Sequence, residues 1–332
     1  MFDQRAWGRR ALLALTLAFV LCDAAIAGAQ QPRVYRVGIL AEGSPPPPGT
    51  PSVLVQTLHT LGYVVGQNLG IERRWAEGRA ERFPSLAADL VALTPNVIVT
   101  EGTLAALAAA RATAAIPIVL VGVGDPVGSG LVASLARPGG NVTGVAEFGV
   151  ETAGKLVEIA HVLVPKAQRI AVLRSDNPVH PLALKMIQVA AEKSGLTVLP
   201  AMAKSPEDID GAFVSMTKQT PGALIVLGGP PFSNLEQSNK IISFAATNRL
   251  PAVYPGRLWV ERGGLMSYGS NYLHRWKMAA AYVDKILKGA RPSDLPIQQP
   301  TEFQLVINRT TATALGITIP QELLARADHV IE

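Results

Sequence analysis

The sequence predicts an α/β protein made of two doubly wound parallel-sheet lobes joined by a hinge. Short aliphatic strands alternate with amphipathic helices from residue 34, and the pattern restarts after residue 150. Hydrophobic residues make up 48% of the chain and aromatic residues only 5%, which suits helices packed on sheets of short strands. The length of 332 residues also suggests two domains, at about 100–200 residues per domain.

The first half contains four expected strands, each followed by a helix. The strands cover residues 34–40, 69–75, 96–99 and 116–121, and the helices cover residues 53–61, 80–93, 104–111 and 130–135. In the second helix, apolar residues recur at i, i+3 and i+4, namely Phe83, Leu86, Ala87, Leu90 and Val91. A Pro-Gly-Gly-Asn turn at residues 138–141 closes this half.

The second half repeats the alternation. Its expected helices cover residues 152–163, 182–194, 206–218, 235–248 and 274–287, and its strands cover residues 169–173, 197–199, 223–227, 252–254, 264–268 and 303–307. Strands that alternate with helices in this way predict parallel sheets with helices on both faces. One compact sheet would not hold so many strands, and no linker of biased composition separates the halves. We therefore expect two similar lobes with a cleft between them.

Residues 1–29 have the three parts of a signal peptide. An arginine-rich start is followed by an apolar run at residues 11–21, too short to span a bilayer, and by a small-x-small site ending at Ala29. We expect cleavage after Ala29 and export to the periplasm, by either the general or the twin-arginine pathway. The only cysteine, Cys22, lies in this segment behind Leu21, which is not the small residue of a lipid-anchor site. The exported chain would then have no thiol for disulfides or metal binding.

Composition and motifs argue against several classes of function. The formal charge is +5 with a pI of about 9.4, but the basic residues are scattered, so we expect no nucleic-acid binding. The histidines lack the spacing of a metal site, and the chain has neither a G-x-S-x-G elbow nor a phosphate-binding P-loop. We expect a protein that is not an enzyme and uses no metal or cofactor.

Ligands of open parallel sheets bind beyond the carboxyl ends of the strands. This rule selects polar or glycine-containing loops after the expected strands, and the residues in them are candidate ligand contacts. They are Glu42, Ser44, Glu101, Gly102, Thr103, Gly124, Asp125, Ser175, Asp176, Gly229, Pro230, Tyr254 and Arg257.

Several of these residues also have a purely structural interpretation. The turn at Glu101 to Thr103 opens a helix and suits an anion, but Thr103 could simply cap that helix. Asp125 could meet a ligand ammonium group or cap the segment after it. Ser175 and Asp176 could line the cleft or initiate the next helix through an Asx-Pro turn. Glu42 and Ser44 precede four prolines, a rigid stretch that is either the edge of the cleft mouth or a spacer.

Some of the same loops resemble those of the bacterial ABC-transporter substrate-binding protein family that includes tryptophan and tyrosine binders. The most specific are Gly-Asp-Pro-Val at residues 124–127 and Ala-Arg-Pro-Gly-Gly-Asn-Val-Thr-Gly at residues 136–144. Supporting stretches are Leu-Gly-Tyr at 61–63, Arg-Trp-Ala-Glu-Gly at 74–78, Ser-Tyr-Gly at 267–269 and Leu-Val-Ile-Asn at 305–308. The resemblance extends over about residues 33–332.

The resemblance implies a type I periplasmic-binding-protein fold whose chain crosses between the lobes three times. The N-terminal lobe would then comprise residues 33–147 and 270–300, and the C-terminal lobe residues 148–269 and 301–332. Phe148 and Asn271, at two of the crossings, join the candidate ligand contacts.

The implied function is an extracytoplasmic, monomeric receptor that closes on a small molecule and delivers it to an ABC permease in the inner membrane. The ligand would be an amino acid or an organic anion. Two alternatives stay open: a sensor subunit of a signalling system, and an exported α/β enzyme.

The sequence departs from the resemblance at one informative place. Aromatic-amino-acid binders of this family tend to have acidic residues near positions 254–257, whereas this chain has Arg257 there, and Gly229-Pro230 replaces a polar turn. Arg257 could pair with a ligand carboxylate or with Glu261 one helical turn away.

Overall fold

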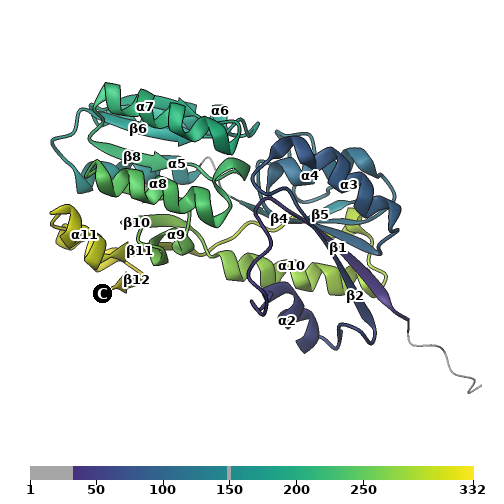
Figure 1. The fold of residues 1–332 in the computed structure, drawn as a ribbon. Coiled ribbons are helices and arrows are strands. Elements are labelled where there is room, and N and C mark those ends of the chain that lie inside the picture. The colour runs from purple at the N-terminus through teal and green to yellow at the C-terminus, as the bar shows by residue number, and fades with distance from the viewer. Residues whose placement is uncertain (1–32, 148–150) are drawn as a thin grey trace, which may run out of the picture.

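The computed structural model describes residues 33–147 and 151–332. In this part of the chain the strands form two sheets, one of five strands and one of seven, and each sheet is the centre of one lobe (Figure 1). The predicted fold class, α/β with two lobes, is therefore confirmed. The expected signal peptide, its Cys22 and the candidate Phe148 lie outside the described residues.

The N-terminal lobe is built on a parallel sheet in the order β2-β1-β3-β4-β5. Its strands are β1 (Tyr35–Ala41), β2 (Leu69–Trp75), β3 (Val97–Glu101), β4 (Ile118–Gly124) and β5 (Val142–Glu147). Its helices are α2 (Val53–Thr60), α3 (Phe83–Ala92), α4 (Thr103–Ala112) and α10 (Tyr272–Leu287), with short 3-10 turns η1 (Ala80–Arg82) and η4 (Pro292–Asp294). Successive strand residues face opposite sides, so Val37 and Ile39 pack with α2 and α10, whereas Leu40 packs with α3 and α4.

The C-terminal lobe is built on a mixed sheet in the order β12-β11-β10-β9-β8-β6-β7. Its strands are β6 (Arg169–Arg174), β7 (Thr197–Met202), β8 (Ala223–Val226), β9 (Ala252–Tyr254), β10 (Met266–Ser270), β11 (Phe303–Asn308) and β12 (His329–Ile331). Its helices are α5 (Glu151–Leu163), α6 (His180–Lys193), α7 (Ile209–Gln219), α8 (Leu235–Thr247), α9 (Arg257–Glu261), α11 (Arg309–Leu315) and α12 (Gln321–Arg326), with turns η2 (Pro206–Asp208) and η3 (Pro230–Phe232). The core has α5 and α6 on one face of the sheet and α7 and α8 on the other.

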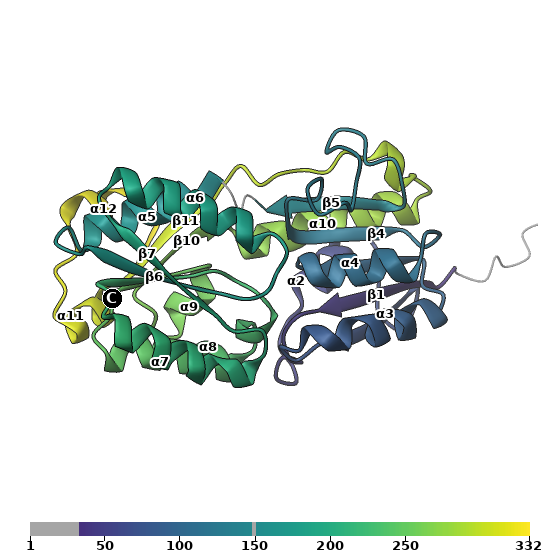
Figure 2. The ribbon, with the colours of Figure 1, turned by 90° about the horizontal axis from the view of Figure 1, so that it is seen from above.

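Helix α10 joins the N-terminal lobe although the strand before it, β10, belongs to the other sheet. Its buried stripe, including Trp276, Ala280 and Val283, packs with α2 and the first sheet. Asn271 caps the helix, because its side chain accepts a hydrogen bond of 3.1 Å from the His274 amide. The chain thus passes between the sheets after β5, after β10 and before β11. The passage before β11 runs along one edge of the molecule in Figure 2.

Four details differ from the sequence prediction. Residues 130–135 form no helix, because the amides of Leu131 and Val132 both donate to the carbonyl of Pro126 in an irregular turn. Strand β5 was not predicted, because the Pro-Gly-Gly-Asn turn before it looked like the end of the half. The sheet of the C-terminal lobe is not all parallel: β11 runs antiparallel to β10. Elements α11, α12 and β12 at the C-terminus were not predicted either.

None of the helices among the described residues is long and apolar enough to cross a membrane.

Candidate ligand-binding site between the lobes

A cavity of about 340 Å³ lies between the lobes and receives residues from both. Its walls are the carboxyl ends of β1, β3, β4 and β5 on one side and of β6, β8, β9 and β10 on the other. The structure of parallel sheets places ligands at these ends. The volume matches one small molecule, since ligand pockets span about 300–1,000 Å³.

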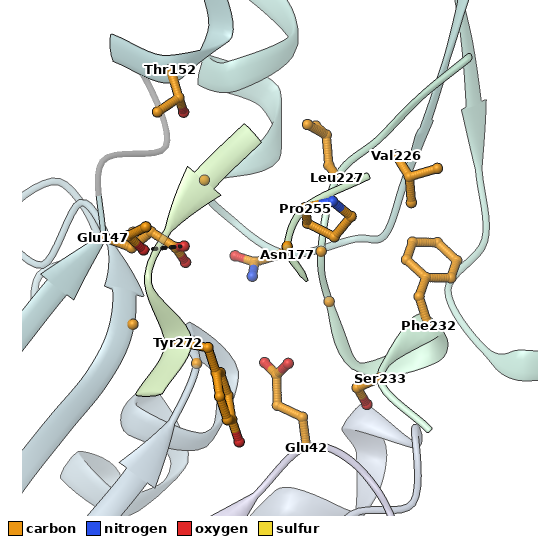
Figure 3. A pocket seen from close by; sticks show the side chains of 18 of the residues that line it. Glu42, Glu147, Thr152, Asn177, Val226, Leu227, Phe232, Ser233, Pro255 and Tyr272 are labelled. Carbon is orange, nitrogen blue, oxygen red and sulfur yellow. Dashed lines mark hydrogen bonds between the residues drawn. The ribbon is translucent and has the colours of Figure 1, made fainter. Parts of the chain in front are cut away.

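The wall of the N-terminal lobe is acidic. Glu42 follows β1, Glu101 ends β3 and Glu147 ends β5, so three carboxylates meet where neighbouring strands end. Figure 3 shows the Glu42 carboxylate beside the Tyr272 ring, pointing into the cavity. The guanidinium of Arg275, from α10, is the cation among them.

Two of these carboxylates have partners in the protein. Arg275 Nη1 lies 2.9 Å from Glu147 Oε1, and Ser270 Oγ donates to the same oxygen at 3.2 Å. The Tyr272 hydroxyl donates to Glu101 Oε1 at 3.2 Å. Among the described residues, the Glu42 carboxylate has neither a hydrogen bond nor an ion pair.

Burial and mutual repulsion disfavour ionisation of this cluster. Burial raises the pKa of Glu42 well above its ordinary value, the charges of Glu101 and Glu147 raise it further, and Arg275 opposes them. Burial also raises the pKa of Glu101, against the opposing effects of Tyr272 and Arg275. A positive charge placed in the cavity would relieve both effects.

Two glycines make room for charged side chains of this wall. Gly102, at φ +81°, faces the Glu42 carboxylate, and Gly122, at φ +70°, faces Arg275 Nη1. A Cβ atom at either position would overlap those groups. Each also has a positive φ that other residues adopt only with strain.

The wall of the C-terminal lobe is mainly apolar and aromatic. Leu227 and Pro255 line the space between the lobes (Figure 3), whereas Phe232 is fully buried in the core of the lobe. Trp259 stacks on buried Tyr254 with ring centroids 5.3 Å apart, and Tyr268 stacks on Phe303 at 5.9 Å.

His180, at the start of α6, is a neutral group in this wall. Its Nδ1 lies 3.2 Å from the amide nitrogen of Ser175 and 3.3 Å from the Ser175 hydroxyl. Burial lowers the pKa of His180 to about 4, so the imidazole is uncharged near neutral pH.

The structure brings eight of the predicted contacts to the cavity wall: Glu42, Glu101, Gly102, Thr103, Gly124, Asp125, Gly229 and Arg257. The others lie elsewhere. Ser44 and Asp176 are exposed, Ser175 and Pro230 are buried behind the wall, Tyr254 is in the core and Asn271 caps α10.

Local contacts support the structural interpretation for Arg257 and Asp125 but not for Thr103. Arg257 Nε donates to Glu261 Oε1 at 2.6 Å, and both side chains are at least 40% exposed. Asp125 Oδ1 accepts from the Gly128 amide at 2.7 Å and so closes a turn. Thr103 is the first residue of α4 rather than its cap, which is Gly102.

Sequence reasoning missed several lining residues, notably Glu147, Asn177, His180, Tyr272 and Arg275. Glu147 would have followed from the strand-end rule if β5 had been recognised. Tyr272 and Arg275 lie in the first turn of a helix that returns from the other lobe, and their position has no local sequence signal.

Comparisons with known proteins identify the family. A model of the ABC transporter substrate binding protein family matches residues 51–331. The chain belongs to this family. It is also similar to a tyrosine-binding protein of Clostridioides difficile, with 28% identity over 265 residues that cover 79% of this chain and 75% of that protein.

Several solved structures resemble this chain over most of its length. A conserved domain protein from Vibrio cholerae is 29% identical with a TM-score of 0.81, covering 90% of this chain and 100% of its own. An ABC domain in complex with L-Trp from Streptococcus pneumonia is 28% identical with a TM-score of 0.80, at the same coverage. A ligand-free, open substrate binding protein from Clostridium difficile is 25% identical with a TM-score of 0.60, covering 90% and 99%. The chain is therefore a substrate-binding protein with the type I periplasmic-binding-protein fold.

Proposed function

We propose that this protein is an extracytoplasmic receptor that closes its lobes on one small molecule bearing an ammonium group and delivers it to an ABC permease. The observation behind this proposal is the cavity shared by both lobes, with the unpartnered Glu42 carboxylate at its acidic wall.

The two walls favour a ligand with a cationic head and an apolar body. The head would lie between Glu42 and Glu101, where it would also meet the face of the Tyr272 ring. The body would lie on the partly exposed apolar groups of the C-terminal lobe, such as Leu227, Pro255 and Trp259. The tyrosine-binding relative and the L-Trp complex support an amino acid or a related amine.

Contacts between the lobes support a closing motion. On the side of the cleft mouth, Arg79 forms a bidentate ion pair with Glu207, at 2.5 and 3.3 Å. A Cβ on Gly78 would lie 3.1 Å from the carbonyl oxygen of Pro230, and one on Gly43 would lie 3.1 Å from that of Ser233. The TM-score is also higher with the L-Trp complex than with the ligand-free, open relative. These observations fit a closed state stabilised by a ligand that touches both lobes.

A thermal-shift screen of amines, amino acids and carboxylates tests the binding function. A ligand at about 100 times its Kd adds about 2.7 kcal/mol of stability, so a true ligand raises the melting temperature clearly. Glu42→Gln should abolish this rise, whereas the matched variant Glu192→Gln, on an exposed position of α6, should keep it. A screen in which no small molecule shifts the melting temperature contradicts the proposal.

Delivery to a permease is tested by uptake. Cells that lack this chain should lose uptake of the radiolabelled ligand and regain it with the wild-type gene but not with Glu42→Gln. Normal uptake without the chain would favour a sensor subunit, and turnover of the ligand by the pure protein would favour an enzyme.

A further inference from the structure

We propose that the ligand is an organic amine without a carboxylate, a monocation on an apolar body, rather than a zwitterionic amino acid. This inference rests on the proposed function and narrows its ligand. It is carried by the charges that already occupy the cavity and by the partners of every basic group in its wall.

The acidic wall has an excess of negative charge. Glu42, Glu101 and Glu147 face a single guanidinium, that of Arg275, which is paired with Glu147 at 2.9 Å. Glu101 accepts hydrogen bonds from the Tyr272 hydroxyl and from the backbone of Glu42, and both donors are neutral. Two carboxylates are therefore left without a cation, and a zwitterion, whose net charge is zero, would not compensate them.

The place suited to a ligand carboxylate is already filled. An anion would be expected at the start of α4, where backbone amides point outward and the helix dipole is positive. The Glu42 carboxylate lies directly against Gly102, the cap residue of α4, although it accepts no hydrogen bond from the amides there. A ligand carboxylate at this helix start would meet the carboxylate of the protein itself.

The other two arginines of the cavity, Arg257 and Arg262, lie in the C-terminal lobe and not in the acidic wall. Arg257 Nε donates to Glu261 Oε1 at 2.6 Å, and Arg262 Nη1 donates to Ser238 Oγ at 3.0 Å. In the acidic wall, Arg275 is paired with Glu147, and less than 1 Å² of its Nε is accessible. A carboxylate on the same carbon as the ligand's ammonium group would thus lie at the acidic wall without a free cation beside it, at a cost in desolvation.

Three indoles of nearly equal size separate the charge classes: tryptamine, L-tryptophan and indole-3-propionate. Isothermal titration calorimetry on the full chain should give a Kd for tryptamine at least about tenfold lower than for L-tryptophan, the effect of one uncompensated charge. Indole-3-propionate should not bind. Glu42→Gln should weaken tryptamine binding by about tenfold or more, and Glu192→Gln should leave the Kd for tryptamine unchanged.

The outcomes separate this inference from the proposed function. If L-tryptophan binds as tightly as tryptamine, or more tightly, the inference is wrong and the receptor function stands. If indole-3-propionate binds most tightly of the three compounds, the inference is also wrong and the receptor function stands. The same three charge classes, an amine, an amino acid and an acid, are also tested on a phenol body and on a butane body. If no compound on any of the three bodies binds, both the inference and the receptor function fail. Unchanged tryptamine affinity in Glu42→Gln would also overturn the inference, and circular dichroism of the variant establishes that it is folded.

Discussion

At the scale of single residues, two charged side chains of the cavity fit only because glycines lie beside them. Gly102 and Gly122 sit at strand ends, where their missing Cβ atoms leave room for the Glu42 carboxylate and the Arg275 guanidinium. The strand-end rule therefore located most of the acidic wall from the sequence, including Glu42 and Glu101. It did not indicate which polar residues point into the cavity, because Ser175 and Tyr254 follow strands equally well but turn into the core.

Gly102→Ala should weaken tryptamine binding by about tenfold or more, because the added methyl group displaces the Glu42 carboxylate. The matched control is Gly66→Ala: both glycines have positive φ, +81° and +84°, but nothing lies within 4 Å of a Cβ at Gly66. Both variants bear the same backbone strain, so only the contact differs. Equal losses of affinity in calorimetry would contradict the role of Gly102.

Glu42→Gln should change the pH dependence of stability. The pKa of Glu42 is raised in the folded, empty protein, so the folded state binds a proton that the unfolded chain releases. The groups facing Glu42 are Glu101, Glu147 and Arg275, beside Tyr272 (Figure 3). The free energy of unfolding therefore falls as pH rises from the ordinary value of 4.5 through the raised value.

In thermal melts without ligand, Glu42→Gln should be more stable than wild type at about pH 8 and similar to it at about pH 4. Glu192→Gln should follow the wild-type curve at both values. If the melting temperature of Glu42→Gln changed with pH in the same way as that of wild type, the surroundings of Glu42 would not raise the pKa of its carboxyl group.

Arg257→Ala should leave ligand affinity within about twofold of wild type, because its guanidinium is exposed and paired with Glu261. Calorimetry with tryptamine measures the affinity of both proteins. A loss of about tenfold or more would show that Arg257 contacts the ligand.

At the scale of elements, periodicity predicted long helices and buried strands well and the short connecting elements poorly. Strand β2 and strand β9 match the predicted bounds, because their apolar patterns are bounded by clear turns. Strand β5 was missed because it follows a glycine turn that looked like the end of the first half. The antiparallel β11 has the same local pattern as a parallel strand, since direction depends on how the chain returns rather than on composition.

Helix α10 shows why the lobe organisation is not readable from periodicity. Its apolar stripe is ordinary, and only packing with α2 and β4 assigns it to the N-terminal lobe. The exact lobe boundaries remain a prediction from the family resemblance.

Tyr63→Phe tests this placement of α10. The Tyr63 hydroxyl donates to Asp284 Oδ1 on α10 at 2.9 Å across 221 positions of sequence, so its loss should cost about 1 kcal/mol of the free energy of unfolding. Tyr35→Phe is the control, because the ring of Tyr35 packs against Tyr63 and Arg33, and these contacts do not involve its hydroxyl. Urea denaturation measures both, and equal effects would contradict a specific role for the hydrogen bond.

At the scale of the whole molecule, the cavity exists only where the two lobes meet. Glu147 at the end of β5 accepts from Ser270 at the end of β10 and pairs with Arg275 on α10. One carboxylate of the site thus joins two of the passages about which the lobes would rotate. This arrangement links occupancy of the cavity to the relative position of the lobes.

Spin-label distances between the lobes test the central claim, closure on a small cation, most directly. Ala88→Cys on α3 and Lys218→Cys on α7 are exposed positions of the two lobes, on helices that lie along the edge opposite the passages (Figure 2). Cys22→Ser removes the only native cysteine. Pulsed electron paramagnetic resonance should show the inter-lobe distance shorten to one narrow population with saturating tryptamine, and stay long and broad with Glu42→Gln. An unchanged distance distribution in a sample that calorimetry shows to be saturated would contradict the account.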